Sequence, residues 1–128
     1  MTFRILVTGS RDWADHHVVD AAILDLCNWY PIDWDEVVIV HGNCPTGADK
    51  MADEFALDTG ISVERHSADW KKYGRAAGPK RNQQMVDAGA DIVLAFKNPG
   101  SRGTQDCINR ATKAGLIVKV YEPQNQTN

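Results

Sequence analysis

The sequence predicts an α/β fold, a three-layer sandwich in which a mainly parallel five-stranded sheet lies between two layers of helices. Five apolar runs of strand length, rich in β-branched residues, occupy positions 5–7, 37–40, 61–63, 92–95 and 116–121. Near-continuous apolar runs are typical of strands that are buried on both faces of a parallel sheet. Stretches with helical spacing separate these runs, so strands and helices alternate, and right-handed crossovers would place helices on both faces of the sheet.

Each helix is predicted from apolar side chains that recur at the spacing of one helical face. These side chains are Val18, Val19, Ala22, Ile23 and Leu26 in the first helix, Met51, Ala52, Phe55 and Ala56 in the second, Met85 and Val86 in the third, and Ile108, Ala111 and Ala114 in the fourth. The predicted order of elements is therefore β-α-β-α-β-α-β-α-β.

Several helix ends carry local signals. Thr46, followed by Asp49, resembles a capping box with a shorter acid and predicts the start of the second helix. Pro79 falls in a first helical turn, where its missing N–H does no harm. Glycines stand where helices are expected to end, at Gly60, Gly89 and Gly115.

The length of 128 residues suits a single domain, which we expect to span residues 1–122 and to be followed by a polar tail at 123–128. The chain is 43% hydrophobic and 24% charged with a net charge of −3, which is typical of a soluble globular protein and disfavours nucleic acid as a partner. The first residues pass directly into a strand, without the long apolar stretch of a signal peptide or membrane helix. We therefore expect a cytoplasmic protein without membrane contact.

The three cysteines, Cys27, Cys44 and Cys107, lie far apart and form no C-x-x-C pair. This spacing predicts reduced thiols, and neither a disulfide framework nor a metal site is indicated. No cofactor is identified from the sequence. Cys44 sits in a candidate site loop, where it is either a reactive thiol or a small buried residue.

The glycine-containing segments together predict one site. In an open parallel sheet the loops that leave the carboxyl ends of the strands meet at the crevice where the strand order reverses. Glycines allow close backbone approach there, and the helix that follows each loop offers unpaired N–H groups to an anion. A nucleotide phosphate is the ligand that this arrangement favours.

The first of these loops spans residues 8–13, directly after the first strand, and it has neither a G-x-G-x-x-G pattern nor the lysine of a P-loop. Ser10 and the backbone around Gly9 are expected to donate to a phosphate, and Arg11 to pair with it. The alternative is a tight turn with a solvated arginine. Trp13 either stacks on a base or packs beneath the loop.

The second loop, residues 41–49, opens the second helix, and Gly47 would let a ligand approach the backbone closely. Asp49 is interpreted as a partner for ribose or an acid–base group, or else as a helix cap. His41 is interpreted as a contact to base or phosphate, or else as a structural histidine that a backbone group satisfies.

Residues 71–81 carry five basic side chains and no acidic one in a chain that is acidic overall. A basic patch before a helix start suits phosphate binding, and Trp70 or Tyr73 would add an aromatic wall. The alternative is a solvated face or a subunit contact. The basic residues are Lys71, Lys72, Arg75, Lys80 and Arg81.

The loop after the fourth strand places Gly103 and Thr104 at a helix start, where amides and a hydroxyl can meet a phosphate. Asp106 is the carboxylate best placed for chemistry, and its alternative role is to complement the helix dipole. The candidate catalytic residues are thus Asp106 and Asp49. The residues predicted to bind the ligand are Gly9, Ser10, Arg11, Trp13, His41, Gly42, Gly47, Asp49, Arg75, Arg81, Asn82, Ser101, Arg102, Gly103 and Thr104.

Taken in order, these motifs resemble the YspA/YpsA-related (cpYpsA-related) branch of the SLOG superfamily. The resemblance spans nearly the whole chain and rests on the short motifs at 9–13, 41–49, 69–82 and 101–106. It implies a Rossmann-like domain that binds a nucleotide or a nucleotide-derived ligand, either as a sensor or as a processing enzyme.

A more distant similarity is to the lonely-guy phosphoribohydrolases, whose pattern is P-G-G-x-G-T-x-x-E. In residues 99–104 this chain departs from the pattern only at Ser101, but Cys107 stands where that family has its glutamate. The nearest carboxylate is Asp106, and a one-residue shift on a helix turns a side chain by about 100°. Catalytic equivalence therefore does not follow from the resemblance.

Three hypotheses follow. The first is a binding or sensory domain for a nucleotide-like small molecule, phosphoribosyl or ADP-ribose-like, and the alternative is a nucleoside-monophosphate N-glycosidase that uses Asp106 or Asp49. The second alternative is a single-stranded DNA-binding protein, which the net charge disfavours. The sequence does not decide the oligomeric state, although Trp29, Tyr30 and Trp34, if exposed, favour a homo-oligomer.

Overall fold

The computed structural model describes residues 2–123, so most of the tail expected at 123–128 lies outside the described residues. The strands are β1 (Phe3–Gly9), β2 (Val37–His41), β3 (Ser62–Arg65), β4 (Ile92–Phe96) and β5 (Val118–Tyr121), the α-helices are α1 (His16–Trp29), α2 (Gly47–Thr59), α3 (Trp70–Tyr73), α4 (Ala77–Ala88) and α5 (Arg102–Lys113), and two short 3-10 helices span Trp34–Glu36 and Gly74–Ala76. None of the described helices is long and apolar enough to cross a membrane.

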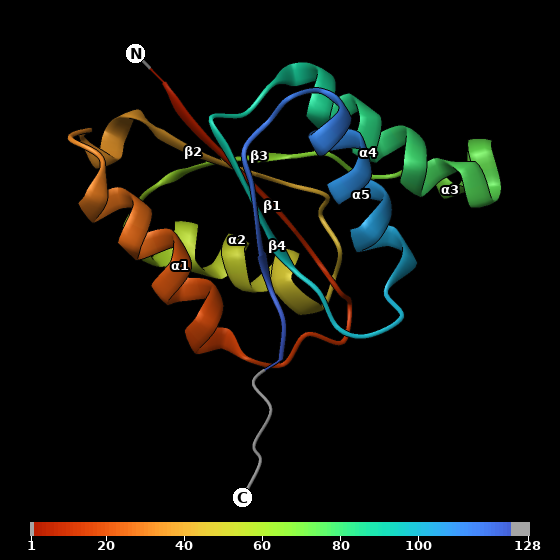
Figure 1. Ribbon diagram of the computed structural model, residues 1–128, viewed down its shortest axis with the longest axis horizontal. Helices are drawn as coiled ribbons and strands as arrows, with labels where there is room; N and C mark the ends of the chain where they lie inside the picture. The colour runs from red at the N-terminus through yellow and green to blue at the C-terminus, as the bar shows by residue number, and fades with distance from the viewer. Residues whose placement is uncertain (1, 124–128) are drawn as a thin grey trace, which may run out of the picture.

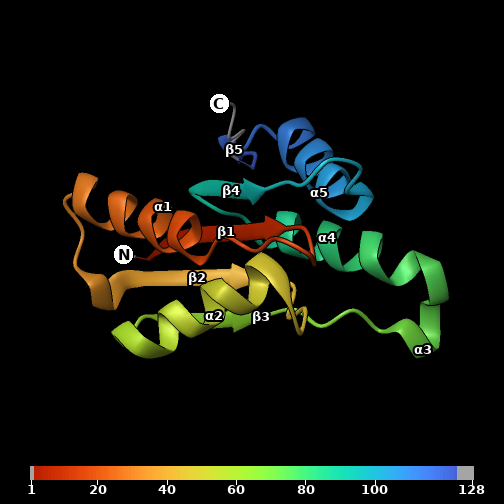
Figure 2. The ribbon, with the colours of Figure 1, turned by 90° about the horizontal axis from the view of Figure 1, so that it is seen from below.

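The sheet confirms the predicted α/β class and is parallel throughout (Figure 2). Its strand order is β3-β2-β1-β4-β5, and Ile5 at the centre pairs with Ile39 on one side and Ile92 on the other. The chain builds outward from β1 to β3 and then returns to the opposite side of β1 with β4. The order therefore reverses between β1 and β4, where an open parallel sheet forms its crevice.

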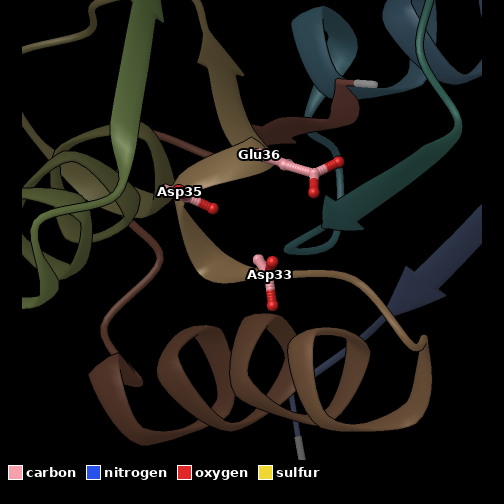
Figure 3. Close-up of side chains that lie close together, drawn as sticks. All are labelled: Asp33, Asp35 and Glu36. Atoms are coloured by element: carbon pink, nitrogen blue, oxygen red, sulfur yellow. The ribbon is translucent and has the colours of Figure 1, made fainter.

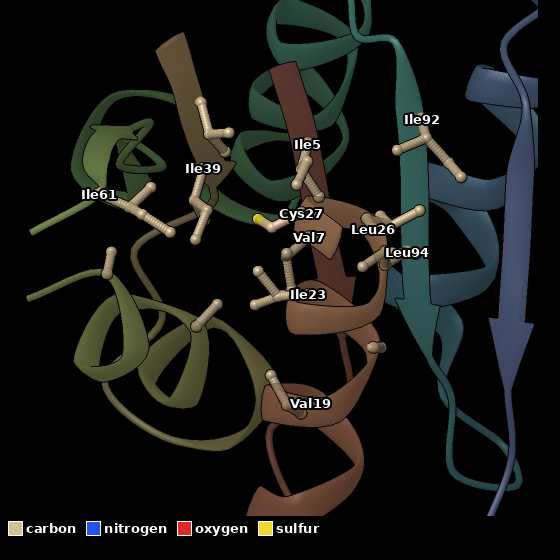
Figure 4. Close-up of a cluster of buried hydrophobic side chains, with 14 of the residues drawn as sticks. Ile5, Val7, Val19, Ile23, Leu26, Cys27, Ile39, Ile61, Ile92 and Leu94 are labelled. Atoms are coloured by element: carbon tan, nitrogen blue, oxygen red, sulfur yellow. The ribbon is translucent and has the colours of Figure 1, made fainter. Parts of the chain in front are cut away.

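Helices cover both faces of the sheet, with α1 and α2 on one face and α4 and α5 on the other (Figure 1). Successive side chains of a strand point to opposite faces, so a strand covered on both sides needs a continuous apolar run. Ile5 and Val7 of β1 accordingly pack against α1 and α2, and Leu6 between them packs against α4 and α5. Figure 4 shows the first of these two clusters, in which Val19 and Ile23 of α1 meet the strands.

The two edge strands differ from the predicted ranges of 61–63 and 116–121. Ile61 is buried in the core, but the ladder with β2 begins one residue later, at Ser62, and ends at Arg65. At the other edge, β5 begins only at Val118, and Leu116 lies in the turn that closes α5, where its N–H donates to the carbonyl of Ala111. An edge strand has one neighbour and one exposed side, so its apolar residues mark its limits poorly. The short helix α3 lacks the length for a helical period and was not predicted.

The capping box predicted at the start of α2 is wrong. Thr46 is the N-cap residue but makes no side-chain cap, and its hydroxyl donates instead to the carbonyl of Arg11 at 2.9 Å. The carboxylate of Asp49 accepts from the N–H of Gly42 at 3.1 Å rather than from the N-cap residue. The predicted end of this helix is confirmed, because Gly60 is the C-cap residue in the left-handed conformation.

Candidate functional site

A pocket of about 740 Å³ lies at the carboxyl ends of the strands, where the strand order reverses between β1 and β4. Its wall is formed by the loops that follow β1, β2 and β4 and by the start of α4. The predicted site residues that line it are Gly9, Ser10, Arg11, Asp49, Arg75, Arg81, Asn82, Ser101, Arg102, Gly103, Thr104 and Asp106. Residues far apart in the sequence thus share one pocket.

Ser10 joins the loops that follow β1 and β4. Its N–H donates to the carbonyl of Phe96 at 2.9 Å, and its hydroxyl accepts from the N–H of Asn98 at 2.8 Å. Gly9 precedes it at a point where a Cβ would meet the side chain of Ala48 and stand 2.9 Å from the carbonyl oxygen of Phe96. Glycine is therefore required here for α2 to pack against the end of β1, as well as for the shape of the pocket floor.

Asp49 projects from the first turn of α2 and is only 4% exposed. One carboxylate oxygen accepts from the N–H groups of Gly42 and Cys44, at 3.1 and 3.4 Å, and the other has no hydrogen-bond partner among the described residues. Burial raises the pKa of Asp49, and this effect outweighs the lowering by His41, Cys44 and Arg81. The geometry gives the pocket a buried carboxyl with one oxygen uncommitted.

Arg81 and Asn82, neighbours in α4, connect the other parts of the wall. Arg81 donates from Nη1 to the carbonyl of Gly42 at 2.6 Å and from Nε to Oδ1 of Asn82 at 3.0 Å. Asn82 donates from Nδ2 to the carboxylate of Asp106 at 3.0 Å and to the carbonyl of Gly103 at 3.3 Å. Through this pair α4 contacts both the loop after β2 and the first turn of α5.

Asp106 lies in the second turn of α5, and its side chain is 30% exposed. Besides the bond from Asn82, it accepts from Nε of Arg110 at 2.9 Å. Burial alone raises the pKa of Asp106, but the hydrogen bonds from Arg110 and Asn82 outweigh it and hold the pKa below its ordinary value. The group is therefore an ionised carboxylate at neutral pH.

Helices α2, α4 and α5 start without a side-chain cap. Their N-cap residues Thr46, Ala76 and Ser101 make no capping hydrogen bond, and the hydroxyl of Ser101 is bonded instead to that of Thr104 at 2.7 Å. In contrast, α1 is capped by Asp15 and α3 by Asp69. Residues 101–104 at the start of α5 all line the pocket, so the first amides of this helix, which have no partner within the helix, remain for a ligand. At α4 the N–H of Ala77 donates to the carbonyl of Gly74, and Pro79 has no N–H.

The charges that line the pocket are mixed, with more arginine than carboxylate. Arg75 and Arg102 are exposed at its rim, whereas Lys72 and Lys80 lie outside it, with their ammonium groups 5.1 and 4.7 Å from the centre of the Tyr73 ring. The basic run predicted as one patch is therefore divided between the pocket and a separate surface. The pocket-lining charges are those of Arg11, Arg75, Arg81 and Arg102 and of Asp12, Asp49 and Asp106.

Two predicted ligand contacts belong to the frame of the protein and not to the pocket. Trp13 is 3% exposed, packs 5.6 Å from the ring of Phe96 and donates from its indole N–H to the carbonyl of Asp15. His41 is 1% exposed, accepts from the N–H of Asn43 at Nδ1 and meets Asp53 at Nε2. The structure therefore agrees with the alternative interpretation of each residue. Trp13 packs beneath the first loop, and His41 is a structural histidine that a backbone N–H satisfies.

Two predicted glycine contacts are also contacts within the protein. A Cβ on Gly47, whose φ is +74°, would meet the backbone of Ser10 and Arg11, so this residue admits the first loop and not a ligand. A Cβ on Gly42 would stand 2.8 Å from the guanidinium carbon of Arg81. Neither glycine lines the pocket, because each is covered by a neighbouring loop or side chain.

Several pocket residues are absent from the predicted set. Most of them are neighbours of the predicted motifs in the sequence, and this proximity is the signal that could have identified them. Met85 follows Arg81 by one helical turn, and nothing in the sequence indicates that it lines the pocket. The sequence predicts Trp70 only as an aromatic wall of the basic patch. The additional lining residues are Thr8, Asp12, Cys44, Trp70, Gly78, Pro79, Met85, Pro99 and Gly100.

A separate acidic cluster lies just before β2, at the amino ends of the strands. Carboxylate oxygens of Asp33, Asp35 and Glu36 lie within 4.8 Å of one another (Figure 3). Asp33 and Asp35 are exposed, and exposed acidic groups commonly gather without a metal ion. We assign no metal to this cluster, and it has no part in the pocket.

This chain is similar to a known protein family and to a phage protein. The family described as "YspA, cpYpsA-related SLOG family" matches residues 3–73, which include the first two loops and Trp70. The "Gene 61 protein" of Mycobacterium phage D29 is 42% identical over 120 residues, which cover 90% of this chain and 93% of that protein.

Proposed function

The chain belongs to the YspA, cpYpsA-related SLOG family, and on this premise we propose that it binds a nucleotide or nucleotide-derived ligand in the pocket at the carboxyl ends of its strands. Membership of this family suggests a nucleotide-related function. The finer proposal is a phosphoribosyl or ADP-ribose-like ligand, held by a domain that acts as a sensor or in nucleotide processing.

The observation that carries the proposal is the meeting of the uncapped start of α5 with four arginines in one pocket. Uncapped amides and the positive end of the helix dipole favour an anion, and an arginine fork matches the oxygens of a phosphate. The volume of about 740 Å³ lies in the range of small-molecule sites, so it accommodates a nucleoside beside the phosphate.

The start of α5 is the part of the pocket best suited to the phosphate. Gly103 is open to its surroundings, with no heavy atom within 4 Å of the position that a Cβ would take. Arg102 is exposed beside it, and the hydroxyl of Ser101 is turned to Thr104 and leaves the first amides uncapped. A phosphate here would receive backbone N–H groups and one guanidinium.

A thermal-shift titration tests this function. Adenosine, AMP, NAD, ADP-ribose and ribose 5-phosphate would be added to the wild type, to Arg102→Gln and to Lys113→Gln, which removes a charge from the last turn of α5 as a control. We expect phosphorylated compounds to stabilise the wild type and the control, with a weaker effect on Arg102→Gln. Equal shifts with adenosine and AMP, or no shift with any compound, would contradict the proposal.

A second candidate function is cleavage of the N-glycosidic bond of a nucleoside monophosphate. The observation that favours it is a pair of pocket carboxyls whose environments move their pKa values in opposite directions. Such a pair is how many sites separate an acid from a base. In this scheme Asp106, held ionised by Arg110 and Asn82, stabilises the positive charge that develops on the ribose, and Asp49 supplies or accepts a proton. Release of free base from AMP or CMP is the measurement.

The expected homo-oligomer remains a prediction. Trp29 is 82% exposed and, together with Tyr30, lines a second cavity of about 590 Å³ beside α1. Exposed aromatic side chains that gather in this way are common at contacts between subunits. Sedimentation velocity of the wild type and of Trp29→Ala would decide it, because a dimer built on this surface should dissociate in the variant.

A further inference from the structure

Trp70 is the one described tryptophan that lines the ligand pocket. It is the first residue of α3, on the segment that connects β3 to α4, and 48% of it is exposed. The other three tryptophans have other positions, because Trp13 is in the core and Trp29 and Trp34 lie away from this pocket. Packing in the core does not account for a large, half-exposed aromatic ring in the wall of a pocket that charged side chains line.

The ring of Trp70 is held in place along one edge. A Cβ on Gly78, in the first turn of α4, would stand 3.3 Å from Cη2 of the indole, so the absence of a side chain at Gly78 lets the ring lie against α4. Asp69 fixes the start of α3 by accepting from the N–H of Lys72 at 3.1 Å. The ring is therefore presented by a supported backbone, a condition for precise stacking.

One face of the ring receives the guanidinium of Arg11, whose Cζ lies 5.4 Å from the ring centre. Arg11 comes from the loop after β1 and also lines the pocket. The contact shows that the face of the indole is accessible to a flat, polarised group from the pocket side. A purine or pyrimidine ring is such a group, and base–aromatic stacking is generally stronger than an exposed cation–π contact.

We propose that Trp70 is the stacking platform for the base of the bound nucleotide, and that the base takes the position that Arg11 holds against the indole. This inference rests on the proposed function and adds that the ligand carries an aromatic base, which the site recognises by its π-face. Arg11, displaced from the ring, then pairs with the phosphate. Trp70 thereby distinguishes a nucleotide from a bare sugar phosphate.

Tyr73 does not share this role. Its ring is contacted by the ammonium groups of Lys72 and Lys80, and it does not line the pocket. Stacking alone discriminates little between bases, because every base presents a π-face. The platform therefore predicts that several bases bind with similar affinity unless a polar contact elsewhere selects one.

Isothermal titration of AMP, CMP, ADP-ribose and ribose 5-phosphate into the wild type, Trp70→Phe, Trp70→Ala and the control Trp29→Ala tests the platform. We expect Trp70→Ala to weaken the base-containing ligands by about 5- to 150-fold, the range for loss of one base–aromatic stack. Trp70→Phe should retain most of the affinity, and ribose 5-phosphate should bind all four proteins alike. AMP should quench the tryptophan fluorescence of the wild type and of Trp29→Ala, and this quench should be lost in Trp70→Phe.

The outcomes separate the two proposals. If the wild type binds ribose 5-phosphate as tightly as AMP, or if Trp70→Ala weakens both equally, the phosphate site stands and the platform is rejected. If AMP binds Trp70→Ala with unchanged affinity, the platform is likewise rejected. If the wild type binds none of these compounds, the proposed function itself fails and the platform with it. Thermal unfolding of each variant establishes that the comparison is made between folded proteins.

Discussion

The guanidinium of Arg81 donates a hydrogen bond of 2.6 Å to the carbonyl of Gly42, a residue 39 positions earlier in the chain. This bond joins the start of α4 to the loop after β2 and positions Arg81, which lines the pocket. It also explains the glycine, because a Cβ at position 42 would stand 2.8 Å from the guanidinium carbon and 3.0 Å from the carboxylate of Asp49.

We expect Gly42→Ala to destabilise the protein by about 1–3 kcal/mol, the usual cost of forcing an extra group into a packed site. The substitution should also weaken ligand binding, because Arg81 must move. Gly103→Ala is the matched control for stability, since nothing lies within 4 Å of its Cβ position and alanine favours the helix. Urea unfolding measures the stability of both variants, and equal stability would contradict the packing role of Gly42.

The hydrogen bonds of His41 assign its ring proton to Nε2. The N–H of Asn43 donates to Nδ1 at 2.9 Å, so Nδ1 must be an acceptor, and Nε2 faces the carboxylate of Asp53 at 2.8 Å. Nitrogen-15 NMR of the imidazole at neutral pH checks this tautomer. Replacement by leucine leaves the Asn43 amide without an acceptor, and we expect a loss of about 1–3 kcal/mol of unfolding free energy.

A pH-dependent contribution to stability is expected from Glu64. Hydrogen bonds from Arg4 and His66 lower the pKa of Glu64 to about 2. Because this pKa is below that of the unfolded chain, the contribution is fully present above the unfolded pKa and is lost as the pH falls toward the folded value. The carboxylate side chain is 38% exposed, so solvent screening limits the effect to about 1 kcal/mol or less.

Unfolding free energies of the wild type and Glu64→Gln, measured between pH 7 and pH 3, test this contribution. The wild type should be the more stable at pH 7, and the difference should shrink as the medium becomes acidic. A difference that stays constant over this range would show that the Arg4–Glu64 pair does not act through the charge of the carboxylate.

Asp106→Asn separates binding from catalysis. The substitution removes the ionised carboxylate that Arg110 and Asn82 contact, and we expect any base release from a nucleoside monophosphate to fall by at least about 100-fold. Nucleotide binding should persist, because the helix amides and Arg102 are untouched. Asp87→Asn, on α4 outside the pocket, is the control. An unchanged rate of base release in Asp106→Asn would reject the role assigned to Asp106.

The cysteines should differ in reactivity. Burial raises the pKa of the Cys107 thiol to about 11, and burial also raises the pKa of Cys27. Cys44 is only partly buried, although its pKa too is raised by burial and by Asp49. In the native protein a thiol reagent should therefore modify Cys44 slowly and the other two only after unfolding. Since Cys44 lines the pocket, AMP should slow its modification further.

Much of the fold follows from local patterns in the sequence. The runs of β1, β2 and β4 are apolar at every position because each of these strands has a helix layer on both faces, so continuity alone identified them. The strand-to-helix loops were also predictable as a shared site, because parallel strands bring all their carboxyl ends to one edge. Edge strands and the four-residue helix α3 were less predictable, since neither has enough buried positions to set a period.

What the sequence by itself determined is the alternation of elements and the placing of glycine, serine and arginine at the strand ends. Tertiary packing decided which of these residues face the pocket. Gly47 is covered by the first loop, His41 and Trp13 are buried, and Trp70 is brought into the pocket by its contact with Gly78. The physical reason is that a sequence period specifies the face on which a side chain lies, whereas its neighbours depend on strand order and on how closely two backbones approach.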